Sequence, residues 1–304
     1  MKVVALAGGT GSAKLLRGLA SLTKDLVVVA NVGDNYWFHG LYVCPDVDIA
    51  LYTLAGIADE RRGWGVRGDT FNVLGQLAML GGETWFRMGD MDLATAILRT
   101  SMLKSGKTLT EATSLIASAL GARCTVLPAT DSPVETLMAT ESGTMHLQEY
   151  WVKNRGLPRV KGVQYKGARK AAPTPQVRKA IARADKVILC PANPVTSIGP
   201  IVAIKGMKAL LSGSRARVVA LSPMVGNGPY SGPAGKLMKQ LGFRPDSVGV
   251  ASLYAGFVDE LVIDKTDEEL KDGVERLGVS CRVADTLMKT GFQEKRIASV
   301  LLKT

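Results

Sequence analysis

Cysteine and histidine are scarce in this chain, which limits the kinds of metal and redox site it can hold. The 304 residues include four cysteines and two histidines. The cysteines lie far apart and form no CxxC pair, so we expect neither a disulfide framework nor a cysteine metal cage. Two histidines are a poor basis for a histidine-ligated zinc site. Together these absences predict a cytoplasmic protein.

Long apolar runs are also missing, although 46% of the residues are hydrophobic and a large core can form. No run approaches the roughly 20 apolar residues that a membrane-spanning helix needs. The first residues, MKVVALA, are apolar, but a glycine-rich turn follows at once. We interpret them as a buried strand rather than a signal peptide. The sequence therefore predicts no membrane association.

Acidic residues are absent from residues 150–184, where lysine and arginine recur. This stretch contributes to a net charge of +11, which favours anionic partners. A solvated basic surface is the simplest interpretation, and a rim that steers a phosphorylated substrate is another. Nucleic-acid binding is disfavoured, because the stretch has few interleaved aromatic residues and matches no known module.

The order of predicted elements indicates an α/β fold. A buried strand at residues 2–7 is followed by a glycine turn, a helix at 12–22 and a valine-rich strand at 26–31. This is the opening of a Rossmann-like, doubly wound, mostly parallel sheet. We expect a single domain over residues 1–304. A largely helical insertion is expected at about 50–120 and a β-hairpin at about 135–151, followed by a surface connection. Helices are expected at 199–211 and 268–277, among others.

Four predicted strand ends share a composition rich in Gly, Asn, Ser and Pro. In open parallel sheets, ligands bind beyond the carboxyl ends of the strands. We therefore expect these segments to meet around one ligand. They are residues 8–11, 31–35, 191–197 and 222–231.

The glycine turn after the first strand is an incomplete dinucleotide fingerprint, with Lys14 where a third glycine belongs. An ordinary strand-to-helix turn needs glycine too. We favour phosphate contact, because hydroxyl and ammonium donors join a helix N-terminus here. The candidate phosphate-binding residues are Gly9, Thr10, Gly11 and Lys14.

Asparagine and serine side chains at two later strand ends suit a nucleobase or a phosphate. They are Asn193, Ser197 and Asn227. Asp34 follows the second strand, where a dehydrogenase places the acid that holds the ribose of NAD, so an NAD(P)-dependent oxidoreductase is an alternative. A plain Asx turn at Asp34 is the structural alternative.

Two carboxylates, Asp46 and Asp48, stand two residues apart before a predicted helix. One of them suffices for N-capping. The pair therefore suggests a metal ligand or a base for a nucleophilic hydroxyl. Asp90 and Asp92 form another acidic group near Arg87, and a surface ion-pair cluster explains that group equally well. Clustered carboxylates favour Mg²⁺, and Asp34 and Asp46 are the predicted ligands.

Several ordered blocks resemble the 2-phospho-L-lactate transferase family of coenzyme F-420 biosynthesis. The resemblance spans nearly the whole chain. The blocks are GGTGSAKL (8–15), HGLYVCPDVD (39–48), WGVRGDTF (64–71), GDMDLAT (89–95), PANPVTSIGP (191–200), SPMVGN (222–227), SGPAGKLM (231–238) and ADTLM (284–288).

The resemblance implies a magnesium-dependent transferase. The family moves a phospholactyl or phosphoenolpyruvyl-type group from a guanosine diphosphate ester to the deazaflavin Fo, and GMP leaves. The resemblance implies that Asp48 and Arg87 bind Fo, and it suggests a homodimer. The carboxylate pair itself makes Asp46 and Asp48 the catalytic candidates. Met91 and Ala96 depart from the family, which has arginine and histidine there. A nucleotide-binding relative without turnover is a third possibility.

Overall fold

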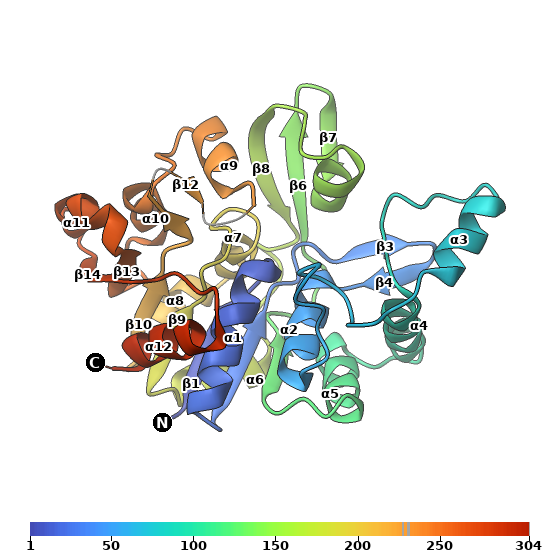
Figure 1. Ribbon diagram of the computed structural model, residues 1–304, viewed down its shortest axis with the longest axis horizontal. Coiled ribbons are helices and arrows are strands. Elements are labelled where there is room, and N and C mark those ends of the chain that lie inside the picture. Colours follow the sequence, from blue (N-terminus) through green and yellow to red (C-terminus); the bar gives the residue numbers. More distant parts are fainter. Residues whose placement is uncertain (227, 230–231, 304) are drawn as a thin grey trace.

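A seven-stranded parallel sheet forms the centre of the protein (Figure 1). The computed structural model describes residues 1–226, 228–229 and 232–303. Within these ranges all neighbouring strands of the central sheet run parallel. In sheet order, the strands are β14 (Ser280–Ala284), β13 (Glu260–Asp264), β10 (Arg217–Leu221), β9 (Lys186–Leu189), β1 (Val3–Ala7), β2 (Leu26–Ala30) and β5 (Thr125–Pro128).

The central strands are apolar along their whole length. All five residues of β1 are buried, and Val4 pairs with Val27 of β2 on one side and Val187 of β9 on the other. Continuous apolar strands are typical of a parallel sheet covered on both faces. The predicted α/β fold with a Rossmann-like, doubly wound sheet is confirmed.

Helices pack on the sheet in two groups, one containing α1, α2 and α12 and the other α6, α7 and α8. Gly18 lets α1 approach α12 closely, since a Cβ there would collide with the Glu294 carbonyl. No helix in the described part of the chain is long and apolar enough to cross a membrane. The bounds are α1 (Gly9–Leu22), α2 (Pro45–Ala55), α6 (Pro175–Ala182), α7 (Ile198–Ala203), α8 (Met207–Ser212), α9 (Ala234–Gln240), α10 (Ser247–Tyr254), α11 (Lys271–Glu275) and α12 (Gly291–Leu302).

Residues 50–120 contain the end of α2 and three further helices. Thr108 and Glu111 form a capping box at the start of α5 (Leu109–Ala119). A short antiparallel hairpin, which we did not expect, precedes this region and packs beside α4. Figure 1 shows α3 far from the central sheet. The elements are α3 (Asn72–Met79), α4 (Asp90–Lys104), α5 (Leu109–Ala119), β3 (Tyr36–Phe38) and β4 (Leu41–Val43).

A small antiparallel sheet stands above one end of the central sheet (Figure 1). The expected hairpin is formed by β6 (Glu135–Thr140) and β7 (Gly143–His146). The segment after it was expected to be a surface connection, and that was wrong. It forms a π-helix, η1 (Glu149–Lys153), and then β8 (Val160–Lys166), which pairs with β6. The lysines of β8 had masked its buried Val160, which packs with Met138.

Two of the expected helices are broken. The helix expected at 199–211 is divided into α7 and α8, because Gly206 adopts a φ of +84° before α8. The helix expected at 268–277 begins as a 3₁₀ helix, η2 (Lys265–Leu270), and continues as α11. Both differences reflect local backbone geometry, which apolar spacing alone does not report. Two-residue strands β11 (Met224–Val225) and β12 (Gly228–Pro229) complete the described elements.

Candidate active site

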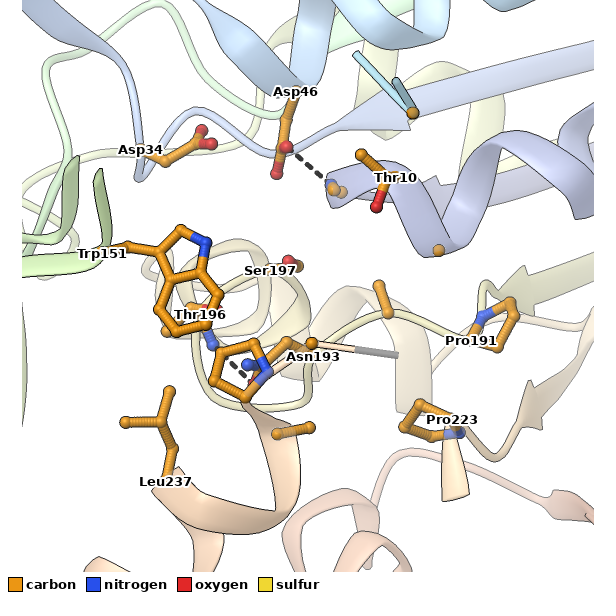
Figure 2. Close-up of a pocket in the computed structure, with 18 of the residues that line it drawn as sticks. Thr10, Asp34, Asp46, Trp151, Pro191, Asn193, Thr196, Ser197, Pro223 and Leu237 are labelled. Carbon is orange, nitrogen blue, oxygen red and sulfur yellow. Dashed lines mark hydrogen bonds between the residues drawn. The ribbon is translucent and has the colours of Figure 1, made fainter. Parts of the chain in front are cut away.

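A cleft opens where the order of strands reverses, between β1 and β9. From β1 the sheet continues through β2 to β5, and from β9 it continues through β10 to β13. Ligands of doubly wound sheets bind at this switch point. The cavity here has a volume of about 510 Å³ (Figure 2). It is lined by residues from all four predicted strand ends, including Gly9, Thr10, Gly11, Lys14, Asp34, Asn193, Ser197 and Ser222, together with Asp46 of α2.

The glycine turn places the N-terminus of α1 at the cleft. Gly8 precedes the helix without a side-chain cap, and the first turn has no acidic residue. Gly11 must be glycine, because a Cβ there would lie 2.5 Å from the Pro191 carbonyl oxygen. Lys14 also lines the cleft, and its Nζ donates to the Met288 carbonyl (2.9 Å). A helix N-terminus beside a lysine can bind an anion such as a phosphate, although the Gly9 N–H of this helix already donates to Asp46.

Asp34 and Asp46 are brought together as buried carboxylates at the cleft, 6% and 5% exposed. Asp46 accepts hydrogen bonds from the Gly9 backbone N–H (2.6 Å) and from Asn31 Nδ2 (2.9 Å). Burial and the charge of Asp46 raise the pKa of Asp34 well above its usual range. Burial also raises the pKa of Asp46, although its hydrogen bonds oppose this. The pair therefore favours binding of a cation or a proton.

Asp48 lies in a different environment from Asp46. Its carboxylate forms a two-pronged ion pair with Arg99 of α4, which is fully buried. Burial raises the pKa of Asp48, and the charge of Arg99 opposes this. Arg99 escaped sequence reasoning because it is 51 residues away and sits in an ordinary helical pattern. A fully buried arginine almost always has such a partner.

The acidic group near Arg87 does not join the cleft pair. Asp90 accepts hydrogen bonds from the backbone N–H groups of Asn72 and Val73 at the start of α3. Asp69 accepts two more at the start of α4. Across the described residues, no three His, Cys, Asp or Glu side chains are grouped to hold a metal ion. Asp90 therefore serves the start of α3 and is not among the described residues that line the cleft.

Arg87, Asp92 and Ala96 lie in or just before α4, near the acidic group described above. The Arg87 guanidinium is exposed and stands 5.2 Å from the centre of the Phe71 ring. Burial and the charge of Asp48 raise the pKa of Asp92 to about 6. Ala96 is buried with Phe38, so this departure from the family contributes to a packed cluster. The assignment of Arg87 and Asp48 to an acceptor stays a prediction.

The loop after β9 offers one unused donor to the cleft. Asn193 Oδ1 accepts from the backbone N–H groups of Val195 (2.9 Å) and Thr196 (3.3 Å). Its Nδ2 is buried and has no hydrogen-bond partner among the described residues. A ligand oxygen or ring nitrogen would satisfy this group. Asn227, the other asparagine predicted to bind the nucleotide, lies outside the described residues.

The small antiparallel sheet contributes residues that sequence reasoning missed. Gln148 Nε2 donates to the Asp34 carbonyl (3.1 Å), and His146 Nδ1 accepts from the Gln148 backbone N–H (3.1 Å). Leu147, Tyr150 and Trp151 line the cleft. No local signal indicates these contacts, because they depend on how the hairpin packs against the loop after β2.

Comparison with known proteins adds independent evidence. The family model described as 2-phospho-L-lactate transferase CofD matches residues 3–293. A 2-phospho-L-lactate transferase of Methanosarcina mazei is 39% identical, covering 99% of each chain. A phosphoenolpyruvate transferase of Streptomyces griseus is 40% identical, covering 95% of this chain and 93% of its own.

A solved structure supports the fold alone. A UPF0052 family protein of Bacillus halodurans superposes with a TM-score of 0.68 at 18% identity, with full coverage of both chains. The curated relatives at about 40% identity are transferases, so the NAD(P)-dependent oxidoreductase alternative is set aside. The chain belongs to the 2-phospho-L-lactate transferase CofD family and is a transferase.

Proposed function

We propose that this transferase moves a phospholactyl or phosphoenolpyruvyl group from a guanosine diphosphate ester to the ribityl hydroxyl of Fo, in coenzyme F-420 biosynthesis. The names of the two groups of relatives support these alternative donors. The observation that carries the proposal is the buried Asp34–Asp46 pair beside the N-terminus of α1. A helix N-terminus and paired carboxylates are the elements that handle a metal-bound diphosphate.

Asp34 and Asp46 fit a magnesium ion. They are close, buried and mutually repulsive, and a divalent cation relieves that repulsion. Mg²⁺ is usually held by one or two carboxylates, waters and substrate phosphates, so two protein ligands suffice. When bound, the ion neutralises charge that builds up on the transferred phosphate.

The protein's side chains and the N-terminus of α1 hold and orient the two substrates. The terminal ribityl hydroxyl of Fo attacks the phosphorus that carries the lactyl or enolpyruvyl group, the bond to the GMP phosphate breaks, and GMP leaves. The N-terminus of α1 and Lys14 hold the diphosphate. Asp46 receives the hydroxyl proton on the carboxylate oxygen that does not hold the ion. Arg87 and Asp48 hold Fo, and Arg99 fixes the Asp48 carboxylate.

The proposal is tested by incubating the purified protein with Fo, Mg²⁺ and each donor ester separately. Mass analysis should detect GMP and the phosphodiester product with at least one donor. Absence of product with both donors would contradict the proposal, and GDP binding without product would favour the non-catalytic relative. We also propose a homodimer, which light scattering of the same sample would test.

A further inference from the structure

The cleft is lined by two kinds of surface. The N-terminus of α1, Lys14 and the Asp34–Asp46 pair suit phosphates and a cation. Leu147, Trp151 and Leu237 supply apolar and aromatic surface. Figure 2 shows the Trp151 ring at the cleft, and Asn193 lines the same cavity. A ligand that contacts both kinds of surface joins a phosphorylated part to a flat or apolar part.

Trp151 is unusually exposed for an aromatic residue inside a cleft. It is 42% exposed, although it lies within the helical η1 segment. Its benzo ring rests on Gly156, where a Cβ would approach Cζ3 and Cε3 to 2.7 and 2.8 Å. The Gly156 carbonyl in turn accepts from Tyr150 Oη (3.1 Å) and Lys236 Nζ (2.6 Å). The ring is therefore supported from beneath, while its exposed part faces the cleft.

We propose that the Trp151 indole is a stacking surface for a planar heteroaromatic ring of a substrate. This inference rests on the proposed function, which supplies two such rings, the guanine of the donor and the deazaflavin of the acceptor. A supported, exposed indole loses little freedom on binding, and every planar ring offers a face to it. Asn193 lines the same cavity, and its Nδ2, which has no partner among the described residues, can donate to a carbonyl oxygen or ring nitrogen at the edge of the stacked ring.

Binding measurements with Trp151→Ala, Trp151→Phe and the wild type test this inference. The ligands are GDP, Fo and inorganic pyrophosphate, each titrated by calorimetry in Mg²⁺. Trp37→Ala is the matched control, because Trp37 is 55% exposed but stands against Tyr42 and not among the cleft residues. Pyrophosphate binding reports whether each variant retains its folded phosphate site.

Trp151→Ala should weaken binding of GDP or Fo by about 5- to 150-fold, the range for loss of one aromatic–base stack. Trp151→Phe should retain most of that affinity, and pyrophosphate should bind all variants alike. The ligand that is weakened identifies which ring is stacked. Trp37→Ala should bind all three ligands like the wild type.

Unchanged binding of both GDP and Fo by Trp151→Ala would overturn the inference, as would equal weakening of pyrophosphate. Turnover by the wild type separates this outcome from failure of the proposed function. If the wild type forms product and Trp151→Ala binds GDP and Fo normally, only the stacking role is refuted. If the wild type forms no product but Trp151→Ala still weakens binding of GDP or Fo, only the proposed reaction is refuted.

Discussion

Asp34 and Asp46 of the cleft differ from Asp48, Asp69 and Asp90 in how their charge is compensated. Asp48 is paired with Arg99 of α4, and Asp69 and Asp90 accept hydrogen bonds at the starts of α4 and α3. In the cleft, Asp34 and Asp46 repel each other and form no ion pair with any described residue. A compensated carboxylate is held in place, as Asp48 is by Arg99, whereas an uncompensated buried pair costs stability and indicates a site that binds a cation or a proton.

Asp46→Asn should have the largest effect on activity. Removing a carboxylate that accepts a proton in the reaction is expected to lower turnover by about 10²- to 10⁴-fold. Thermal stability should fall little, because the change also removes repulsion with Asp34. Turnover with saturating donor and Fo, and melting temperature, are the measurements.

Asp90→Asn is the matched control for that experiment. Asparagine keeps one of the two oxygens that accept hydrogen bonds at the start of α3, so turnover should stay near wild type and stability should fall only modestly. If the Asp90 variant lost as much turnover as the Asp46 variant, the distinction between the two groups of carboxylates would be wrong.

Arg99→Met should have the largest effect on stability. It leaves the buried Asp48 without its partner, which typically costs about 3–5 kcal/mol in the free energy of unfolding. Denaturant unfolding measures this cost. The double variant Asp48→Leu with Arg99→Met should recover much of the loss, because no charge then stays buried unpaired.

Arg87→Met provides the surface comparison, since Arg87 is exposed and should change stability by less than about 0.5 kcal/mol. Equal destabilisation by Arg87→Met and Arg99→Met would show that the buried pair contributes no more than a surface charge.

Stability should also depend on pH through the cleft pair, with a smaller effect. Folding raises the pKa of Asp34 and Asp46, so the folded protein binds more protons than the unfolded chain above their ordinary pKa. Their contribution to stability is therefore lost as pH rises from about 4 through the folded pKa values. Asp34→Asn should flatten this part of a pH series of urea unfolding curves. If the unfolding free energy of Asp34→Asn fell as steeply with pH as that of the wild type, the pH dependence would not come from the Asp34–Asp46 pair.

The fold was largely predictable because apolar strands, a glycine turn and capping residues are local signals. The meeting of the four strand ends at one cleft was predictable, since parallel strands end at the same edge of a sheet. The short strands β3 and β4 and the lysine-rich β8 were missed, because each is stabilised by its neighbours rather than by its own pattern.

Within the site, nearness in the sequence did not predict which side chains line the cleft. Asp46 and Asp48 are two residues apart, yet only Asp46 lines the cleft. The sequence did not reveal the roles of Arg99 and Gln148, because their partners are 51 and 114 residues away. It did not reveal the role of Trp151, because that role depends on exposure within a cavity. Such long-range contacts have no periodicity that a single sequence displays.

The central claim is that Asp34 and Asp46 hold a cation that in turn binds diphosphate. Calorimetric titration of GDP, with Mg²⁺ and with excess chelator, tests it most directly in the wild type and in Asp34→Asn with Asp46→Asn. We predict that chelation weakens GDP binding to the wild type only. In chelator the double variant should bind GDP at least as tightly as the wild type, because two charges that repel phosphate are gone. Equal GDP affinity of the wild type with and without Mg²⁺ would contradict the claim.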